Sequence, residues 1–448
     1  EYSASMADRR FERWRWTTFA VTWLIYASLY LTRKSFSVAK IAFADDSEVT
    51  LTRNDYGLVD SFYLTTYMVG QFIFGPLGDR FGPRRILLFG ISLSIAAAVA
   101  YGFSTTFFVM ALLAVAQGVA QSTGWSNTTK VMSSWFSQRE RGRIIGWWCT
   151  HYAVGAAVAL PLAGYLMTRF GSPRPAGEAG SDIVPYWPAA FWGSAALVSI
   201  VLLIAWRFLR ERPEDVGLSS IEEYHHEDET VILEGDVPED EPDRSWKVIG
   251  EVLRVPSIWL LGLAYFSIKL TRYAFYFWGP KYINESLGAD AQESTIIAAA
   301  LPIGGVLGVI ATGYISDYCF QSRRAPVAIL SLLVTAGIML LGLGDITNHW
   351  MMAGFFFMVG MFLFGPDTLI SGTAAIDFGT KKGAGTAAGV VNGVGSLGAI
   401  LGGWLPGYLT TENDWSSLFY VFLVGILASA IVLIPMWNAK PYSAERAS

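Results

Sequence analysis

The sequence predicts an all-α integral membrane protein with twelve transmembrane helices, arranged as two six-helix bundles related by a pseudo-two-fold axis. Composition is the first observation: 53% of the 448 residues are apolar and only 15% are charged, against roughly 25% charged in an ordinary soluble protein. The second is a series of apolar runs of membrane-spanning length. The third is a short motif that recurs in the second half of the chain. The composition excludes a soluble enzyme.

The apolar runs set the number of helices. A helix needs about 20 apolar residues to cross the hydrocarbon core of a bilayer. Twelve runs of suitable length are bounded by charged or turn residues. The first six are predicted at residues 16–44, 58–77, 86–103, 107–132, 144–167 and 186–209. The second six are predicted at residues 257–282, 295–315, 325–343, 350–374, 384–409 and 418–437.

An acidic stretch separates the two sets of helices. Residues 211–243 contain 14 acidic residues and one Arg, so the rest of this chain of net charge −5 carries about +8. A segment with this charge density cannot bury a core and is typical of a solvated linker. We therefore predict an N-terminal bundle over residues 1–210, a linker over 211–248 and a C-terminal bundle over 249–448. The basic bundles favour anionic ligands or anionic lipid.

Positive charge in the short loops predicts the orientation. The loops on one side carry Arg80, Arg84, Arg85, Arg323 and Arg324. The loops on the opposite side hold far fewer cations, chiefly Arg169, Arg174 and Lys281. Since Lys and Arg concentrate in cytoplasmic loops, we expect a multi-pass protein of the cell (inner) membrane with both termini and the linker in the cytoplasm.

A loop motif reveals an internal repeat. Gly75 and Asp79, four residues apart, are followed by Arg80, Arg84 and Arg85 between the second and third helices. Gly313 and Asp317 have the same spacing, lie 238 residues later and are followed by Arg323. Two parallel six-helix repeats are the arrangement in which a substrate binds near the membrane midplane. We expect the two aspartates to pair with loop arginines and so to stabilise one conformational state.

Two arginines lie deep in predicted helices at matching places in the repeat. Arg33 and Arg272 are 239 residues apart. An Arg at the bilayer centre costs roughly 2.5–3.5 kcal/mol on insertion scales, so each needs a compensating partner. No equally deep acid stands out as that partner. We interpret the pair as cations that face a central cavity and bind an anion there; snorkelling to the interface is the alternative for Arg33.

The residue types favour phosphate as the anion. A guanidinium offers two parallel donors to a phosphate group, which Lys binds only as a point charge. Lys269 lies one helical turn before Arg272, and Tyr26 and Tyr30 lie on the turns before Arg33. These side chains and Tyr273 supply further donors on the same helical faces.

These residues resemble a known family. The repeated loop motif within a 6+6 helix pattern is similar to the major facilitator superfamily. More specific segments resemble its organophosphate:phosphate antiporters, which include the bacterial glycerol-3-phosphate and hexose-phosphate transporters. The matching segments are Tyr30-Leu-Thr-Arg33-Lys34, Leu270-Thr-Arg272-Tyr273, Arg212-Pro213, and Phe364-Gly365-Pro366.

The resemblance implies exchange of a phosphorylated organic anion for inorganic phosphate by alternating access. It implies that Arg33 and Arg272 bind the phosphate, that His151 lies at the site, and that Trp125 belongs to a family Gly-Trp pair. From its chemistry alone, His151 could donate a hydrogen bond to phosphate, or it could be a packing residue. We expect a monomer whose partners are the organophosphate, inorganic phosphate and membrane lipid.

The chain departs from the family pattern at three positions. Gln71 stands where the glycerol-phosphate transporters carry Lys, and Lys269 stands where they carry Tyr. Asp367 directly follows Phe364-Gly365-Pro366 and is an unexpected intramembrane acid. Pairing with Lys269, binding of a substrate amine or hydroxyl, and proton transfer are three open interpretations of Asp367. The sequence therefore does not determine which organic group the substrate carries.

Two other functions compete with exchange. Some relatives act as non-transporting organophosphate sensors, and Asp367 would suit a proton-coupled organic-anion symporter. The chain has no phosphate-binding loop of the nucleotide-binding type, no metal-spaced His/Cys cluster and no nucleophile with a base. We therefore expect no enzymatic activity, no cofactor and no metal, and the acidic linker argues against nucleic-acid binding.

Overall fold

The computed structural model describes residues 2–137, 144–145, 147–175, 182–221, 250–321, 323–344, 346–374, 384–411 and 414–438. Over these ranges, contacts divide the chain into two compact units. The first contains residues up to Leu51 together with those from Phe62 to the linker, and the second contains Thr52–Ser61 together with the rest of the chain. Most of the predicted linker lies outside the described ranges, and the predicted domain boundaries stay a prediction.

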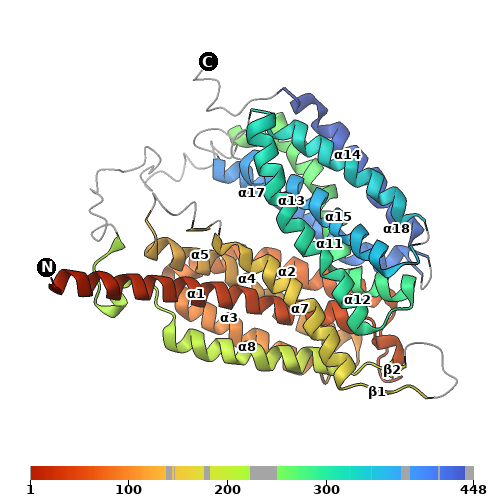
Figure 1. Cartoon of the computed structure of the whole chain (residues 1–448), viewed down its shortest axis with the longest axis horizontal. Coiled ribbons are helices and arrows are strands. Elements are labelled where there is room, and N and C mark those ends of the chain that lie inside the picture. The colour runs from red at the N-terminus through yellow and green to blue at the C-terminus, as the bar shows by residue number, and fades with distance from the viewer. Residues whose placement is uncertain are drawn as a thin grey trace. The chain divides into compact units, whose positions relative to one another are not determined.

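The first unit consists of long helices and one short hairpin (Figure 1). Its elements are α1 (Tyr2–Ala39), η1 (Phe43–Asp45), α2 (Arg53–Phe81, from Phe62 onward), α3 (Pro83–Tyr101), α4 (Phe107–Ser122), α5 (Gly124–Trp135), α7 (Thr150–Arg169), β1 (Ser172–Pro173), β2 (Ile183–Val184), α8 (Pro188–Phe208) and η2 (Pro213–Val216). Helix α1 packs chiefly against α7 and α8, and β1 pairs antiparallel with β2.

The second unit repeats this helical plan. Its elements are α11 (Pro256–Leu287), α12 (Ala291–Ala298), α13 (Ala300–Cys319), α14 (Arg324–Gly342), α15 (His349–Thr368), the π-helix η3 (Leu369–Ala374), α17 (Ala384–Leu409), α18 (Ser416–Leu433) and η4 (Ile434–Met436). Helix α11 packs mainly on α17, and α13 packs mainly on α15. Each predicted apolar run therefore corresponds to helical structure, which confirms the all-α membrane fold class.

Local sequence explains where several helices begin and end. The Asp290 carboxylate accepts a hydrogen bond from the Glu293 amide and caps α12, and Asn348 caps α15 in the same way. Gly82 has φ +88° and precedes Pro83, the first residue of α3. L side chains rarely adopt this backbone conformation, so the turn favours glycine.

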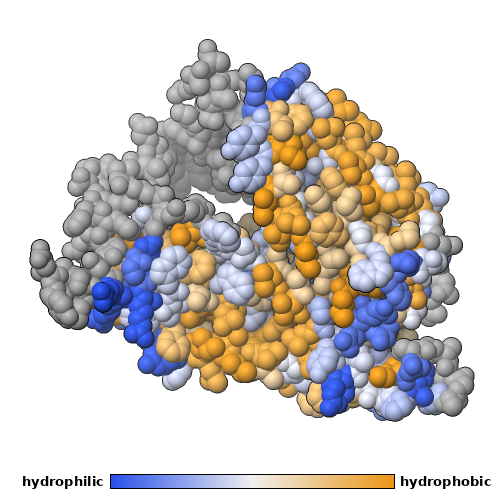
Figure 2. Space-filling model, in the orientation of Figure 1, coloured by the Kyte–Doolittle hydropathy of each residue, from blue (hydrophilic) through white to orange (hydrophobic). Residues whose placement is uncertain are grey.

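The outward faces of the helices are apolar. Within the described ranges, nine helical segments are long and apolar enough to cross a membrane. Leu330, Leu333 and Leu341 of α14 are examples of large exposed apolar side chains. Figure 2 shows a largely hydrophobic surface over the helices of this unit. Such a surface is typical of helices that face lipid. The remaining long helices, α1, α2 and α11, include the ones that carry Arg33 and Arg272.

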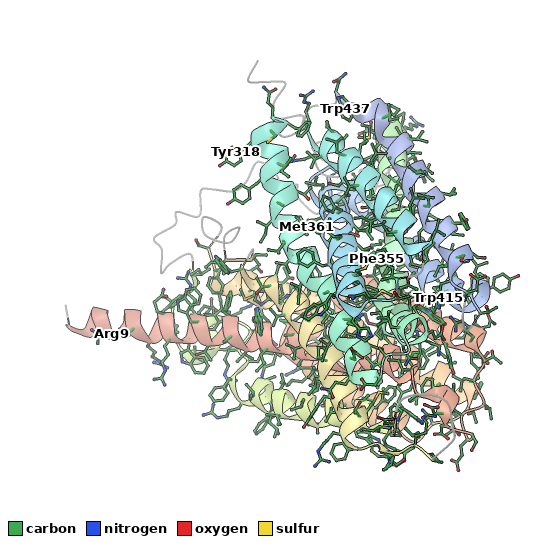
Figure 3. The ribbon with its side chains drawn as sticks, turned by 45° about the vertical axis from the view of Figure 1, so that its right-hand side comes forward. Arg9, Tyr318, Phe355, Met361, Trp415 and Trp437 are labelled. Carbon is green, nitrogen blue, oxygen red and sulfur yellow. The ribbon has the colours of Figure 1, made fainter. Side chains whose placement is uncertain are left out.

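Aromatic packing fills the core of the second unit at one end of α11. Phe275 lies 5.5 Å from Phe356 and 5.4 Å from Phe422, measured between ring centroids. Phe355 also packs on Phe275, and Phe419 connects Phe355 to Tyr282, which contacts Trp415; Phe355 and Trp415 are labelled in Figure 3. Aromatic pairs at these distances add about 0.5–1.5 kcal/mol each beyond the burial of their area. The cluster fixes α11 against α15 and α18, and so fixes the helix that carries Arg272.

The first two turns of α2 belong to the second unit. Arg53 donates two hydrogen bonds to Glu285, at 2.7 and 3.0 Å, and a third to Thr410 at 2.8 Å. Trp415 and Lys281 also bind Glu285. A bidentate Arg–carboxylate pair with little solvent exposure is among the stronger polar contacts in proteins. This cluster fastens the start of α2 to α11 and α17.

Candidate functional site

Arg33 on α1 is held in the first unit by a neutral partner. Its Nε and Nη2 atoms donate hydrogen bonds to Gln121 Oε1 on α4, at 3.3 and 3.0 Å. The Gln121 amide is itself fixed, since its Nε2 donates to Leu29 O and to Thr32 Oγ1 at 3.0 Å each. Among the residues that the structure describes, no carboxylate pairs with Arg33. The half-buried guanidinium therefore keeps its full positive charge.

Tyrosine rings cover the Arg33 guanidinium. Its Cζ lies 4.5 Å from the centre of the Tyr30 ring and 5.1 Å from that of Tyr67, which belongs to α2. Cation–π contacts of this kind contribute about 0.5–2 kcal/mol and offset part of the cost of burying the charge. They leave the edge of the guanidinium, which carries the N–H donors, to bind an acceptor.

His151 on α7 lies in an aromatic cage beside this arginine. Its ring centroid is 4.2 Å from that of Tyr26 and 4.2 Å from that of Trp148, and Trp125 follows at 6.2 Å. His151 is fully buried, and neither ring nitrogen has a hydrogen-bond partner among the described residues. The structure thus gathers the predicted residues Tyr26, Trp125 and His151, but the imidazole reaches no open space here. Trp125 is the exposed member of this group.

Arg272 on α11 has an acidic partner in the second unit. Its Nη1 lies 2.5 Å from Oδ2 of Asp367 on α15, and its Cζ lies 4.0 Å from the centre of the Phe364 ring. The expectation that no deep acid pairs with either arginine is therefore wrong for Arg272. The suggested pairing of Asp367 with Lys269 is also wrong, because the Lys269 Nζ lies over the Tyr265 ring at 4.8 Å instead. Lys269 and Arg272 are three residues apart on one helical face, so either could meet an acid on α15.

The aromatic contacts described for Tyr273 are with neighbours on its own helix. Its ring stacks on that of Phe277 at 6.0 Å and lies 6.3 Å from that of Tyr276. Stacking along α11 gives Tyr273 a packing function, and its place in substrate binding stays a prediction.

The predicted gating residues form a polar cluster at the end of α2. Asp79 pairs with Lys130 of α5, not with the loop arginines that we expected. Arg84 donates a hydrogen bond to Trp206 O at 2.6 Å, and its amide donates to Glu211 Oε1 at 3.1 Å. A cavity of about 380 Å³ lies beside them, with Asp79, Arg85, Lys130, Glu211 and Arg212 among its lining residues. The motif thus joins α2, α5 and the start of the linker within one unit.

The other predicted gating residues make weaker or undescribed contacts. The Arg80 guanidinium lies over the Phe81 ring at 5.4 Å, and Arg323 Nε donates to Phe320 O at 3.2 Å. The side chain of Asp317 lies outside the described residues. At the end of α8, burial together with the neighbouring cations Arg84 and Arg207 lowers the pKa of Arg210. This end of the first unit is therefore crowded with positive charge.

Sequence reasoning missed three side chains that shape the two arginine environments. Gln121 and Tyr67 hold Arg33, and Phe364 covers Arg272. A buried amide in an apolar helix is costly without partners, so Gln121 within the predicted span 107–132 was a usable signal. Nothing in the sequence distinguishes Tyr67 from the many other aromatic residues of the chain, and the Phe364-Gly365-Pro366 segment did not indicate that the Phe364 ring contacts Arg272.

Comparison with known proteins agrees with this fold. The profile of the Major Facilitator Superfamily matches residues 22–402 and 282–447. A solved bacterial homologue of the human lysosomal transporter Spinster superposes with a TM-score of 0.68 over 95% of each chain, at 16% identity. That likeness concerns the fold alone.

Relatives by sequence span nearly the whole chain. The "Membrane sensor protein UhpC" of Salmonella typhimurium is 31% identical over 97% of this chain and 94% of its own length. The "Probable hexose phosphate transport protein" of Chlamydia trachomatis is 27% identical over 99% and 95%. The human "Sugar phosphate exchanger 3" is 26% identical over 93% and 92%. The chain is a membrane protein that belongs to the Major Facilitator Superfamily, a transporter family rather than an enzyme family.

Proposed function

We propose that this protein is a secondary transporter that exchanges a phosphorylated organic anion, of the sugar phosphate or glycerol phosphate type, for inorganic phosphate by alternating access. One observation carries the proposal: Arg33 lies in an apolar helix with a neutral hydrogen-bond partner and no acid among the described residues. An intramembrane guanidinium in that setting needs an anion. The relatives named as hexose phosphate transport proteins and sugar phosphate exchangers support a phosphate ester as the substrate.

Both arginines serve the phosphoryl group in this proposal. Arg33 supplies an uncompensated charge, and Arg272 supplies donors whose charge is partly offset by Asp367. Lys269, Tyr30 and Tyr26 assist them, and Trp125, His151 and Tyr273 shape the surroundings. Since an anion neutralises the buried cations, the loaded carrier changes conformation more readily than the empty one, which makes exchange obligatory.

The remaining parts of the proposal concern setting and gating. We place the protein in the cell (inner) membrane as a monomer surrounded by lipid, with both termini in the cytoplasm. Asp79, Arg80, Arg84 and Arg85 then lie at the cytoplasmic end with Asp317 and Arg323. There they stabilise one state of the transport cycle through contacts such as Asp79 with Lys130.

Counterflow in proteoliposomes tests the proposal. The purified full chain is reconstituted with unlabelled phosphate inside, and uptake of labelled phosphate is followed with and without external glucose 6-phosphate or glycerol 3-phosphate. We expect uptake that depends on internal phosphate and that the organophosphate inhibits, and none in protein-free vesicles. Uptake without internal phosphate that follows a pH gradient would instead indicate symport.

A sensor is the second candidate, because one relative at 31% identity is named a membrane sensor protein. A sensor binds organophosphate without carrying it. Equilibrium binding of glucose 6-phosphate to the purified chain, combined with absent counterflow in the same preparation, would establish that function and reject exchange.

A further inference from the structure

The two carboxylate oxygens of Asp367 differ in their partners. Oδ2 receives Nη1 of Arg272 at 2.5 Å. Oδ1 is buried and has no hydrogen-bond partner among the described residues, in a side chain that is only 6% exposed. A buried acceptor without a donor is costly, and more so when it belongs to a charged group. Oδ1 is therefore an acceptor that lacks its donor.

The described side chains beside Asp367 make other contacts. Thr368, the next residue in the chain, donates its hydroxyl to Phe364 O at 3.0 Å. The Lys269 ammonium lies over the Tyr265 ring and forms no ion pair within the described ranges. Lys269 is close enough to interact electrostatically with Asp367, but it does not supply a hydrogen bond to Oδ1.

Two polar groups beside the Arg272–Asp367 pair thus have an unmet requirement. Among the described residues, Lys269 forms no ion pair with an acid, and Asp367 Oδ1 accepts no hydrogen bond. A ligand that meets both must carry an anionic group and, separately, a hydrogen-bond donor. Unprotonated phosphate oxygens meet only the first requirement and are repelled by the carboxylate, and inorganic phosphate carries its donor hydroxyl on the same small anion. A phosphate ester whose organic part carries hydroxyl groups meets the two requirements with separate groups.

We propose that Asp367 Oδ1 accepts a hydrogen bond from a hydroxyl of the organic part of the substrate, which makes Asp367 the residue that selects hydroxylated phosphate esters over inorganic phosphate. This inference rests on the proposed function and names the substrate class within it. A hydroxyl bound to a carboxylate forms a charge-assisted hydrogen bond, which is stronger than a neutral one. Asp367 binds substrate through one oxygen and holds Arg272 through the other.

The test is equilibrium binding to the full-length protein with Asp367→Asn. The single carbonyl oxygen of Asn can stay on Arg272, which leaves the NH₂ group where Oδ1 was, and an amide nitrogen cannot accept a hydrogen bond. We expect glucose 6-phosphate to bind about 10- to 100-fold more weakly. Inorganic phosphate should bind within about 3-fold of wild type or more tightly, since the carboxylate charge no longer opposes it.

Deoxy analogues of glucose 6-phosphate sharpen the test. On the wild-type protein, removal of the hydroxyl that meets Oδ1 should weaken binding about 10-fold or more. On Asp367→Asn, the same deoxy analogue and its parent should bind alike, because the acceptor is gone. Asp414→Asn is the matched control, since Asp414 is an exposed acid outside the candidate site, and it should leave all these affinities unchanged.

Each other outcome is decisive. Equal weakening of phosphate and glucose 6-phosphate would mean that Asp367 only positions Arg272, and the inference would be overturned. Wild-type binding that is indifferent to every deoxy position would overturn it without any variant, so the test holds even if Asp367→Asn does not fold. Wild-type protein that binds neither ligand would count against the proposed function as well, which separates the two failures.

Discussion

Arg33 and Arg272 lie at matching places in two repeats, yet their surroundings are opposite. Arg33 meets a neutral amide oxygen at 3.0 Å and tyrosine faces, whereas Arg272 meets a carboxylate at 2.5 Å and a phenylalanine face. A neutral partner fixes the direction of a guanidinium and leaves its charge, but a carboxylate offsets the charge. Under the proposed function, we therefore expect the first unit to attract the anion more strongly and the second to recognise the rest of the ligand.

Conservative replacement of each arginine tests this difference with the largest expected effect. Arg33→Lys removes the paired donors from the uncompensated cation, and we expect exchange efficiency in proteoliposomes to fall at least about 100-fold. Arg272→Lys should lower the exchange efficiency by only about 10-fold, since Asp367 already offsets the charge of Arg272. Equal losses would contradict the asymmetry, and full activity in both variants would reject the two-arginine account altogether.

A double-mutant cycle on Arg272 and Asp367 has the next largest effect. Asp367→Leu leaves a guanidinium without its acid, and we expect it to destabilise the protein by about 2 kcal/mol. Combining it with Arg272→Met should recover most of that loss, because the buried pair is then replaced by apolar contacts. Thermal unfolding of the wild type, the two single variants and the double variant in the same detergent gives the coupling free energy between the two side chains. Additive losses would show that the two side chains do not interact.

Arg33→Met is the matched variant in the first unit. Within the described part of the chain, no acid loses its partner when Arg33 is removed. Removal of the buried charge also offsets the lost contacts with Gln121 and the tyrosine rings, so we expect the stability to change by less than about 1 kcal/mol. Destabilisation as large as that of Asp367→Leu would reveal an acidic partner of Arg33.

Gln121→Glu makes the first unit resemble the second and tests the effect of the Arg33 charge on anion binding. A carboxylate at the position of Gln121 Oε1 would offset the Arg33 charge, and we expect labelled phosphate to bind about 10-fold more weakly. Gln121→Met is the control, because it loses the same amide hydrogen bonds without adding charge, and it should stay within about 3-fold of wild type. Unchanged affinity in Gln121→Glu would show that the Arg33 charge does not attract the anion.

The fold could be predicted from hydropathy because lipid leaves the backbone no alternative. Every N–H and C=O within the bilayer must be satisfied inside the segment, so a run of apolar residues becomes a helix. Breaks within the runs could not be predicted. The spans 107–132 and 295–315 each contain two helices, with junctions at Thr123 and Ala299. These breaks depend on packing between helices, which hydropathy does not report.

The candidate site was predicted in part for a related reason. Insertion cost alone singles out Arg33 and Arg272, because an intramembrane arginine is rare. Their partners depend on how each helix is rotated about its axis, and the sequence leaves that rotation open. Asp367 could have met Lys269 or Arg272, and the packing of Phe364 on the guanidinium accompanies the second choice. Likewise, Asp79 meets Lys130 across α2 and α5, which its loop position did not suggest.

The π-helix Leu369–Ala374 begins two residues after Asp367. A π turn holds one residue more than an α turn, since each N–H reaches the fifth carbonyl before it. Deletion of a single residue here would thus convert the segment to ordinary α-helix and remove the widened turn beside the Asp367–Arg272 pair. A relative that is one residue shorter at this place would therefore hold the corresponding carboxylate next to a regular helix.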